Sequence, residues 1–352
     1  MPTYTHGGDL YAARQAYGGP VLDFSANLNP LGMPPQVRAA AKAAVDEAIH
    51  YPDPLCRALR DGIAGRDGVT PEQVVCGNGG ADLIFRLCTA LRPGRALVTA
   101  PTFSEYEQAL QAMGCEVVRH PLAEEELFAL TPALLSQINP GLGLCFLCSP
   151  NNPTGQTISL SLLRTAAETC RGVGAVLVVD QCFLELCDGR EGAQLSEWLE
   201  EFPNLVLLRA FTKSYAIPGL RLGYCLTGNR GLAEGLYTCG QPWPVSGPAQ
   251  AAGLAALACP DWPEQARTLI QRERPFLTEK LGVLGLKVYP GRANYLLFRA
   301  TGDETLKERL LARGVLIRSC ANYPGLGPGY YRIAVRTHEE NEALLAALRE
   351  VL

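Results

Sequence analysis

Residues 142–180 read LGLCFLCSPNNPTGQTISLSLLRTAAETCRGVGAVLVVD, and this stretch decides the fold class. The apolar runs at 142–150 and 175–180 predict two buried strands, and the residues at 161–174 between them predict a helix. Strands that are apolar along their whole length are usually covered on both faces, as in parallel sheets. The stretch therefore predicts part of a buried, mostly parallel sheet with helices on both of its faces.

The same alternation of strand and helix continues on both sides of this unit. Further strands are expected at 74–76, 96–101, 115–122, 204–211 and 221–228, and further helices at 39–49, 81–91 and 104–113. The fold class is therefore predicted to be α/β.

The length of 352 residues favours two domains. The proline-rich segment QPWPVSGP at 241–248 predicts a boundary, and the helical and strand-like stretches after it predict a smaller α+β domain. We expect a large domain at 36–240 and a small domain at 241–352. Residues 1–35 are expected to form an N-terminal arm or to join the small domain.

The charge balance and the apolar pattern exclude two classes of partner. The 31 basic residues are outnumbered by 35 acidic ones, which argues against a nucleic-acid-binding face. No apolar run reaches the roughly 18 residues of a membrane span, and the start MPTYTHGGDL does not resemble a secretion signal. We therefore expect a cytoplasmic protein that binds neither nucleic acid nor membrane.

The 13 cysteines and four histidines do not predict a metal site. The cysteines are scattered singly in apolar stretches, which indicates buried, reduced thiols. Cys145 and Cys148 form a CxxC motif, but it lies in an expected strand and has no second pair at zinc-ligand spacing. The histidines are too far apart in sequence to form a ligand pair on one helix.

Four features lie where expected strands end, which is where ligands bind in open α/β sheets. They are GNGGAD at 77–82, SPNNPTG at 149–155, Asp180 and Lys213. Each alone has an ordinary structural explanation: a helix-entry turn, a loop, a helix cap and a solvated lysine. Their occurrence together favours one shared site.

Lys213 is the residue that points to a particular chemistry. The basic residues comprise 26 arginines and only five lysines, and Lys213 is the one lysine in an apolar context, AFTKSYAIPGL. Desolvation lowers the pKa of such an amine and makes it available for a Schiff base, which arginine cannot form. The other lysines have solvated contexts: Lys42, Lys280, Lys287 and Lys307.

The groups around Lys213 correspond to the parts of pyridoxal 5′-phosphate. Asp180 suits the pyridine nitrogen, Asn152 a phenolic oxygen and Phe103 a ring face. The phosphate would be held by Arg221 and by the backbone amides of Gly79, Gly80 and Ala81 at a helix N-terminus. This set predicts pyridoxal 5′-phosphate as the cofactor.

The segments GNGGAD, PTFSEY, SPNNPTG, DQCF and TKSYAIPGLRLGY resemble, in this order, the fold-type I aminotransferase-like enzymes, close to the histidinol-phosphate aminotransferases. The resemblance implies a mostly parallel seven-stranded sheet flanked by helices and a smaller domain. The segments HGGD, DFSANLNPLGMP, YPDP, VYPGRANYLL, LIRSCANYPGL and RIAVR extend it over nearly the whole chain, to the threonine-phosphate decarboxylase branch of cobalamin biosynthesis.

The resemblance also implies roles for individual residues. Lys213 would bind the cofactor aldehyde, with Thr212 a further candidate at its phosphate, and Tyr51 would reach the partner subunit's cofactor in a homodimer with shared sites. Arg336 is expected to bind the substrate α-carboxylate. The remaining substrate residues are expected to be His6 and Arg318 at the substrate phosphate, with Asn29, Asn152 and Asn294 lining the site.

Three residues depart from the family pattern. Phe183 replaces a tyrosine that touches the phenolic oxygen, and Ala210 replaces a phosphate-binding serine. Gln181 follows Asp180 where glutamate is usual. The first two departures are expected to alter the electronics or the binding of the cofactor without removing an essential group.

The expected reaction is decarboxylation of L-threonine O-3-phosphate to (R)-1-amino-2-propanol O-2-phosphate and carbon dioxide. Phosphoserine, which lacks one methyl group, is a second possible substrate. One alternative is an aminotransferase of the same fold acting on histidinol phosphate or another amino acid. A more distant alternative is a non-catalytic regulator that binds the cofactor.

Overall fold

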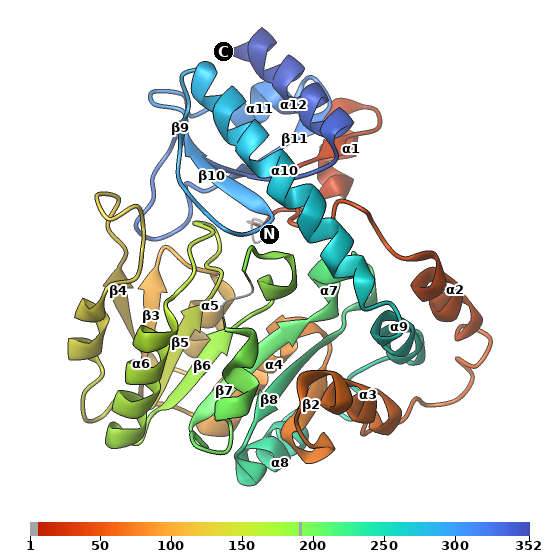
Figure 1. Ribbon diagram of the computed structural model, residues 1–352, viewed down its shortest axis with the longest axis vertical. Helices are drawn as coiled ribbons and strands as arrows, with labels where there is room; N and C mark the ends of the chain where they lie inside the picture. The colour runs from red at the N-terminus through yellow and green to blue at the C-terminus, as the bar shows by residue number, and fades with distance from the viewer. Residues whose placement is uncertain (1–5, 190–191) are drawn as a thin grey trace.

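A seven-stranded sheet forms the centre of the large domain in the computed structural model, which describes residues 6–189 and 192–352 (Figure 1). In spatial order its strands are β2 (Val74–Gly77), β8 (Gly223–Thr227), β7 (Leu205–Ala210), β6 (Val176–Asp180), β5 (Leu144–Cys148), β3 (Arg95–Ala100) and β4 (Glu116–Pro121). The strands from β7 to β4 are parallel, and β8 is antiparallel to both of its neighbours. The structure confirms the predicted α/β class.

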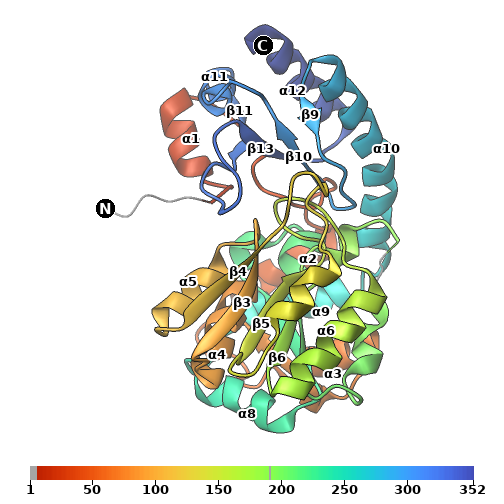
Figure 2. The same ribbon diagram turned by 90° about the vertical axis from the view of Figure 1, so that its left-hand side faces the viewer.

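Two hydrophobic cores cover the two faces of this sheet. Leu147 and Val179 belong to one core, whereas their chain neighbours Phe146 and Val178 belong to the other. Helices α3 (Arg57–Asp67), α6 (Leu160–Val173) and α9 (Gly247–Leu257) pack on the first face, and α4 (Gly79–Leu91), α5 (Glu105–Ala112) and α8 (Arg230–Thr238) on the second (Figure 2). Burial on both faces explains why these strands are apolar along their whole length.

Helix α6 illustrates how the local sequence fixes an element. The Ser159 hydroxyl accepts a hydrogen bond from the Leu162 amide, and Gly174 ends the helix in the left-handed conformation. Ser and Gly are favoured at these two ends for those reasons. The helix therefore begins and ends within one residue of the predicted range, 161–174.

The small domain contains a four-stranded antiparallel sheet. Its strands, in spatial order, are β12 (Arg318–Ser319), β13 (Tyr330–Ala334), β10 (Tyr295–Arg299) and β9 (Lys287–Val288). Helices α10 (Asp261–Val283), α11 (Leu306–Leu311) and α12 (His338–Val351) share a hydrophobic core with one face of this sheet. Leu296 and Phe298 point into that core, so the alternate residues of β10 face the large domain.

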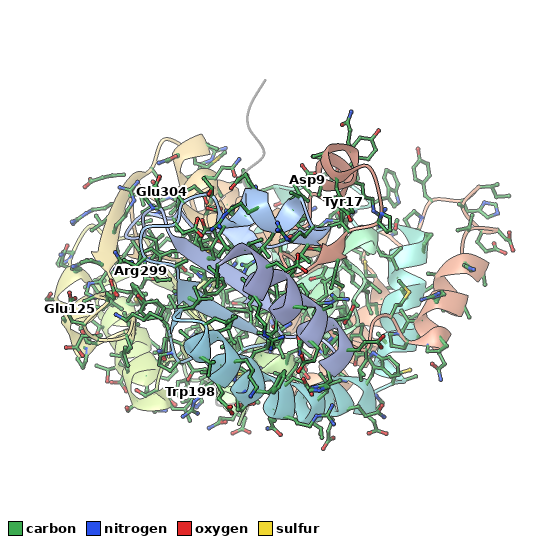
Figure 3. The ribbon with its side chains drawn as sticks, turned by 90° about the horizontal axis from the view of Figure 1, so that it is seen from above. Asp9, Tyr17, Glu125, Trp198, Arg299 and Glu304 are labelled. Carbon is green, nitrogen blue, oxygen red and sulfur yellow. The ribbon has the colours of Figure 1, made fainter. Side chains whose placement is uncertain are left out.

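The N-terminal segment joins the small domain. Strand β1 (Leu22–Asp23) pairs in parallel with β11 (Val315–Leu316), and helix α1 (Leu10–Tyr17) lies beside them. Figure 3 labels Asp9, which caps α1, and Tyr17, which ends it. The chain that follows β1 reaches the large domain, where Asn29 forms hydrogen bonds with Lys213 and Ser214.

Helix α9 belongs with the large domain. It packs against α2 (Pro35–Ala43) and α3, and Ala249, Ala252 and Ala256 lie in the core of the large sheet. The long helix α10 then leads from the large to the small domain (Figure 1). This packing favours a division at the start of α10, and we propose that boundary in place of the one predicted at residue 240.

Three general properties follow from the described residues. None of the helices in this part of the chain is long and apolar enough to cross a membrane. Within the same residues, no group of three or more His, Cys, Asp or Glu side chains could hold a metal ion. All 13 cysteines carry free thiols, most of them buried.

Candidate active site

Lys213 lies at the carboxyl end of β7, in the single helical turn α7 (Phe211–Ser214). Asn29 holds this turn: its backbone N–H donates to the Lys213 carbonyl at 3.0 Å, and its side-chain amide donates to the Ser214 carbonyl at 2.7 Å. The side-chain Oδ1 atom of Asn29 accepts a hydrogen bond from the Leu31 amide. Asn29, which was expected to line the substrate site, therefore positions the lysine.

The surroundings of Lys213 lower the pKa of its amine. Burial and, next, the nearby positive charge of Arg332 lower the pKa of Lys213 to about 8, while Cys182 and Asp180 act in the opposite direction. The Nζ atom lies 5.6 Å from the centre of the Phe183 ring. A larger fraction of this amine is neutral near pH 8 than of an ordinary lysine, and the neutral amine is the form that attacks an aldehyde.

Asp180 ends β6, the strand next to β7, and is 6% exposed. The Tyr106 hydroxyl donates to Asp180 Oδ2 at 2.6 Å, and the Cys182 amide donates to Oδ1 at 2.8 Å. Burial, and next the charge of Asp180, raise the pKa of Tyr106 well above its usual value. Tyr106 therefore remains a hydrogen-bond donor that fixes the carboxylate.

Tyr106 was not among the predicted site residues. Its ring stacks on Phe146, with centroids 4.8 Å apart, and meets the edge of Phe103 at 5.6 Å. The predicted ring-stacking residue Phe103 is thus held by the same tyrosine that orients Asp180. Tyr106 lies in the first turn of α5, three residues after Phe103 in the segment PTFSEY, so it is close in sequence to a predicted site residue.

Replacing Tyr106 by phenylalanine should disturb Asp180 without disturbing the core. The ring remains and the hydrogen bond to a charged group is lost, so we expect kcat/KM to fall about tenfold. We also expect the absorbance maximum of the bound cofactor to shift. Tyr237→Phe is the matched control, because it also removes one phenol hydrogen bond, to the Val74 carbonyl. Equal spectra for the two variants would contradict the assigned role of Tyr106.

The N-terminus of α4 forms a cradle for an anion. Asn78 precedes the helix but makes no side-chain capping hydrogen bond, so backbone N–H groups of the first turn lack a side-chain cap. A Cβ atom on Gly79 would lie 2.5 Å from Nη2 of Arg221, so the guanidinium lies directly against this turn. Gly79 also has a φ of +80°. The cradle therefore requires glycine and suits a phosphate group.

The small domain contributes two arginines from adjacent strands. Arg318 of β12 and Arg332 of β13 are directly opposite each other, and both are buried. Arg332 donates to the Asn152 Oδ1 atom in the large domain and, at 2.6 Å, to the Ser25 carbonyl of the N-terminal segment. Arg318 donates to Asn322 at 2.7 Å. The two guanidinium groups therefore lie on one face of the small sheet, toward the large domain.

These two cations have polar but no anionic partners. In the ranges 6–189 and 192–352, no acidic side chain forms an ion pair with Arg318 or Arg332, and Arg332 Nε has no hydrogen-bond partner. Burying a cation without a counterion is unfavourable. The pair is therefore suited to a ligand with two anionic groups.

Arg336 differs from what was expected of it. Its guanidinium forms an ion pair with Glu340 at 2.6 Å, at the start of α12, and lies over the Phe24 ring. We therefore propose that Arg332, and not Arg336, binds the α-carboxylate. The sequence held a signal for this choice, because Arg336 has an acidic residue four positions later, whereas Arg332 lies in the apolar strand YYRIAV.

The remaining predicted substrate residues lie in the N-terminal segment and the small domain. His6 Nε2 is 3.0 Å from Glu105 Oε1, and its ring is 6.4 Å from the Phe103 ring. Asn294 donates to the Leu28 carbonyl at 3.2 Å, and its Oδ1 atom has no partner. Both amide atoms of Asn27, which was not predicted, are likewise buried without partners. Such atoms are consistent with hydrogen bonds to a ligand.

Tyr51 is 78% exposed and stacks on Trp243, with ring centroids 4.3 Å apart. Both rings line a cleft of about 550 Å³ that also contains Asn78 and Arg221 of the cradle. Within this chain Tyr51 therefore lies at the mouth of the cleft, where an aromatic surface is left uncovered.

Two of the three departures from the family pattern have visible consequences. The Phe183 ring packs edge-on against the Tyr295 ring, with centroids 5.0 Å apart, so the space beside Lys213 Nζ is filled by aromatic groups. Gln181 accepts a hydrogen bond from Arg209 and donates to the Gly192 carbonyl, so it joins a buried structural network. Ala210 and the buried Thr212 flank the start of α7.

The model of the family "Aminotransferase class I and II" matches residues 19–348, so the chain belongs to this family of pyridoxal-phosphate-dependent enzymes. It is 40% identical to the threonine-phosphate decarboxylase of Salmonella typhimurium strain LT2, over 99% of this chain and 96% of the relative. It is also 36% identical to the histidinol-phosphate aminotransferase of Symbiobacterium thermophilum, over 94% of this chain and 91% of the relative.

A solved structure is also similar. The L-threonine-O-3-phosphate decarboxylase of Porphyromonas gingivalis has a TM-score of 0.82 and 25% identity, over 93% of this chain and 98% of that one.

The side chains described above fit pyridoxal 5′-phosphate. Arg221 and the uncapped turn of α4 suit the phosphate, and the fixed carboxylate of Asp180 suits the ring nitrogen. The buried amine of Lys213 suits the aldehyde. These three groups lie along one edge of the sheet, at the carboxyl ends of β2, β6 and β7, with β8 between β2 and β7.

Proposed function

We propose that this enzyme decarboxylates L-threonine O-3-phosphate to (R)-1-amino-2-propanol O-2-phosphate and carbon dioxide, a step in cobalamin biosynthesis. The observation that carries the proposal is the pair of buried arginines, Arg318 and Arg332, without acidic partners. L-Threonine O-3-phosphate has two anionic groups, a carboxylate and a phosphate, that such a pair can bind. The 40% identity to a threonine-phosphate decarboxylase supports the same substrate.

Side chains of both domains would bind the substrate. Arg332 would bind the α-carboxylate by a bidentate contact, and Arg318, with His6, would bind the substrate phosphate. Asn152, already in contact with Arg332, would link this group to the cofactor. The substrate is thereby held at both ends.

Pyridoxal 5′-phosphate, when bound, supplies an electron sink for the charge left on the substrate when carbon dioxide departs. The Asp180 carboxylate, held by Tyr106, would keep a proton on the ring nitrogen. The Nζ atom of Lys213 would deliver a proton to the substrate Cα atom, which its lowered pKa favours near neutral pH. The chain's own residues would therefore position the carboxylate, keep one proton on the ring nitrogen and deliver another to the Cα atom.

The proposal extends to the assembly and the compartment. The exposed Tyr51 and Trp243 beside the cradle support a homodimer in which Tyr51 reaches the partner's cofactor phosphate. The 13 free thiols support a reducing compartment, the cytoplasm.

The decisive experiment is an assay for carbon dioxide. We expect purified protein with bound cofactor to release carbon dioxide from L-threonine O-3-phosphate without any keto acid. L-Serine O-phosphate should react with a kcat/KM lower by about 10- to 200-fold, because one methyl group is missing. Absence of release, with turnover of histidinol phosphate that depends on 2-oxoglutarate, would favour an aminotransferase. The 36% identity to a histidinol-phosphate aminotransferase makes that the second candidate.

A further inference from the structure

Glu124 lies between the two domains, three residues after the end of β4. Its Oε1 atom is 2.6 Å from Lys287 Nζ and accepts a hydrogen bond from the Tyr289 hydroxyl at 2.5 Å. Its Oε2 atom accepts from the Tyr330 hydroxyl at 2.5 Å and from Arg299 at 3.5 Å. One carboxylate of the large domain is thus bound by four side chains of the small domain.

The strand register places these contacts beside the substrate arginines. Arg299 of β10 is directly opposite Lys287 of β9 on one side and Tyr330 of β13 on the other. Because side chains two residues apart on a strand share a face, Tyr330 and Arg332 point the same way. The cross-strand row that binds Glu124 thus consists of Lys287, Arg299 and Tyr330. The next cross-strand row on the same face, two residues further along β13, contains Arg332 and Arg318.

The charge of Glu124 is needed at this place. Lys287 and Arg299 are like charges directly opposite each other, which is an unfavourable pairing in a sheet. Contacts with Lys287, and then with Tyr289 and Tyr330, lower the pKa of Glu124 to about 2. The carboxylate therefore stays ionised over the working pH range and compensates both cations.

The segment around Glu124 is packed on the small domain as well. Phe128 and Leu122 share a hydrophobic cluster with Tyr289, Leu297 and Tyr330. The Phe128 ring meets the edge of the Tyr289 ring at 5.0 Å. Figure 3 labels Glu125 and Arg299 on the same side of the molecule, where this segment meets the small sheet.

We propose that Glu124 is a positioning residue for the reaction: it fixes the small sheet to the large domain and so sets the distance of Arg332 and Arg318 from Lys213. The inference rests on the proposed function. Glu124 contacts the cross-strand row next to the one that contains the two arginines. It acts through these arginines and does not itself bind substrate. Its loss should therefore weaken substrate binding more than it slows the chemical step.

The test is Glu124→Gln, with Glu125→Gln as the matched control, because Glu125 is the exposed neighbour. Substrate binding is followed through the absorbance of the bound cofactor during titration with L-threonine O-3-phosphate. For Glu124→Gln we expect the dissociation constant and KM to rise about tenfold, which corresponds to about 1.4 kcal/mol, and kcat to change less. The absorbance without substrate should be unchanged in both variants, and Glu125→Gln should bind as the wild type does.

A second change separates positioning from general stabilisation. Adding Lys287→Met to Glu124→Gln removes one of the two uncompensated cations but does not restore the contact between the domains, so the melting temperature should recover while KM stays raised. A folded Glu124→Gln with wild-type KM and binding would overturn the proposal, as would a lower melting temperature with no change in KM. If Glu124→Gln does not fold, Tyr330→Phe, which removes one contact, must raise KM or the proposal fails.

The proposed function fails in a different way. In that case the wild-type protein would show no absorbance change with L-threonine O-3-phosphate. A wild-type response that Glu124→Gln reproduces unchanged would contradict the positioning role alone.

Discussion

Replacing Lys213 by alanine should abolish turnover, with kcat/KM lower by at least about 10³-fold, because both the Schiff base and the proton donor are lost. The absorbance band of the bound cofactor should disappear as well. Lys213→Arg should fail in the same way, since it keeps the positive charge but cannot form a Schiff base. Spectra and steady-state rates of the purified variants check both expectations.

Lys280→Ala is the control for this experiment, because Lys280 is a surface lysine paired with Glu279. It should keep the absorbance band and the activity. Borohydride reduction of the wild-type protein should fix the cofactor on the peptide that contains Lys213. A Lys213→Ala protein that retains the band, or a label on another lysine, would refute the assignment.

The pH dependence of cofactor loading follows from the same residue. An ordinary lysine is almost fully protonated below about pH 9, whereas burial and Arg332 lower the pKa of Lys213 to about 8. The neutral amine reacts with the aldehyde, so the rate at which the cofactor-free protein binds pyridoxal 5′-phosphate should rise with pH, reach half of its maximum near pH 8 and level off about one pH unit higher.

The part of the site on the large domain could be predicted because its residues follow strands that the sequence reveals. The apolar runs that end at Cys148, Asp180 and Ala210 form β5, β6 and β7, which are adjacent in the sheet. The polar residue after each run therefore lies at one edge of the sheet. The ends of two apolar runs were therefore enough to locate Asp180 and Lys213 at the site.

The part on the small domain could not be predicted in the same way. Alternation alone does not separate Arg332 from Arg336, which are four residues apart; the end of β13 at Ala334 does, because Arg336 lies beyond it. The face that Arg332 takes depends on the register of an antiparallel sheet, since a shift of one residue reverses the face of every side chain. That register is set by pairings such as Leu297 with Arg332, which lie far apart in the sequence. Asn29 and Glu124 depend on contacts between the N-terminal segment, the large domain and the small domain, and no local pattern indicates them.

The choice between Arg332 and Arg336 gives the second large effect. Arg332→Gln should lower kcat/KM for L-threonine O-3-phosphate by roughly 30-fold or more, because truncating one member of a buried, hydrogen-bonded charge pair costs about 2–5 kcal/mol. Most of the change should appear in KM if Arg332 binds the carboxylate before the reaction. Arg318→Gln should also raise KM, through the substrate phosphate.

Arg336→Gln is the matched control, since it removes the same charge four residues away. Its partner Glu340 is partly exposed, so we expect a loss of at most about 1 kcal/mol in stability and a kcat/KM within about threefold of the wild type. Steady-state kinetics of both variants, with thermal melting to confirm folding, separate the two arginines. A large loss of kcat/KM in Arg336→Gln, with near-normal kinetics in Arg332→Gln, would show that Arg336 binds the α-carboxylate. The row of Arg318 and Arg332 would then need another anion, because two buried cations on adjacent strands are unfavourable without one.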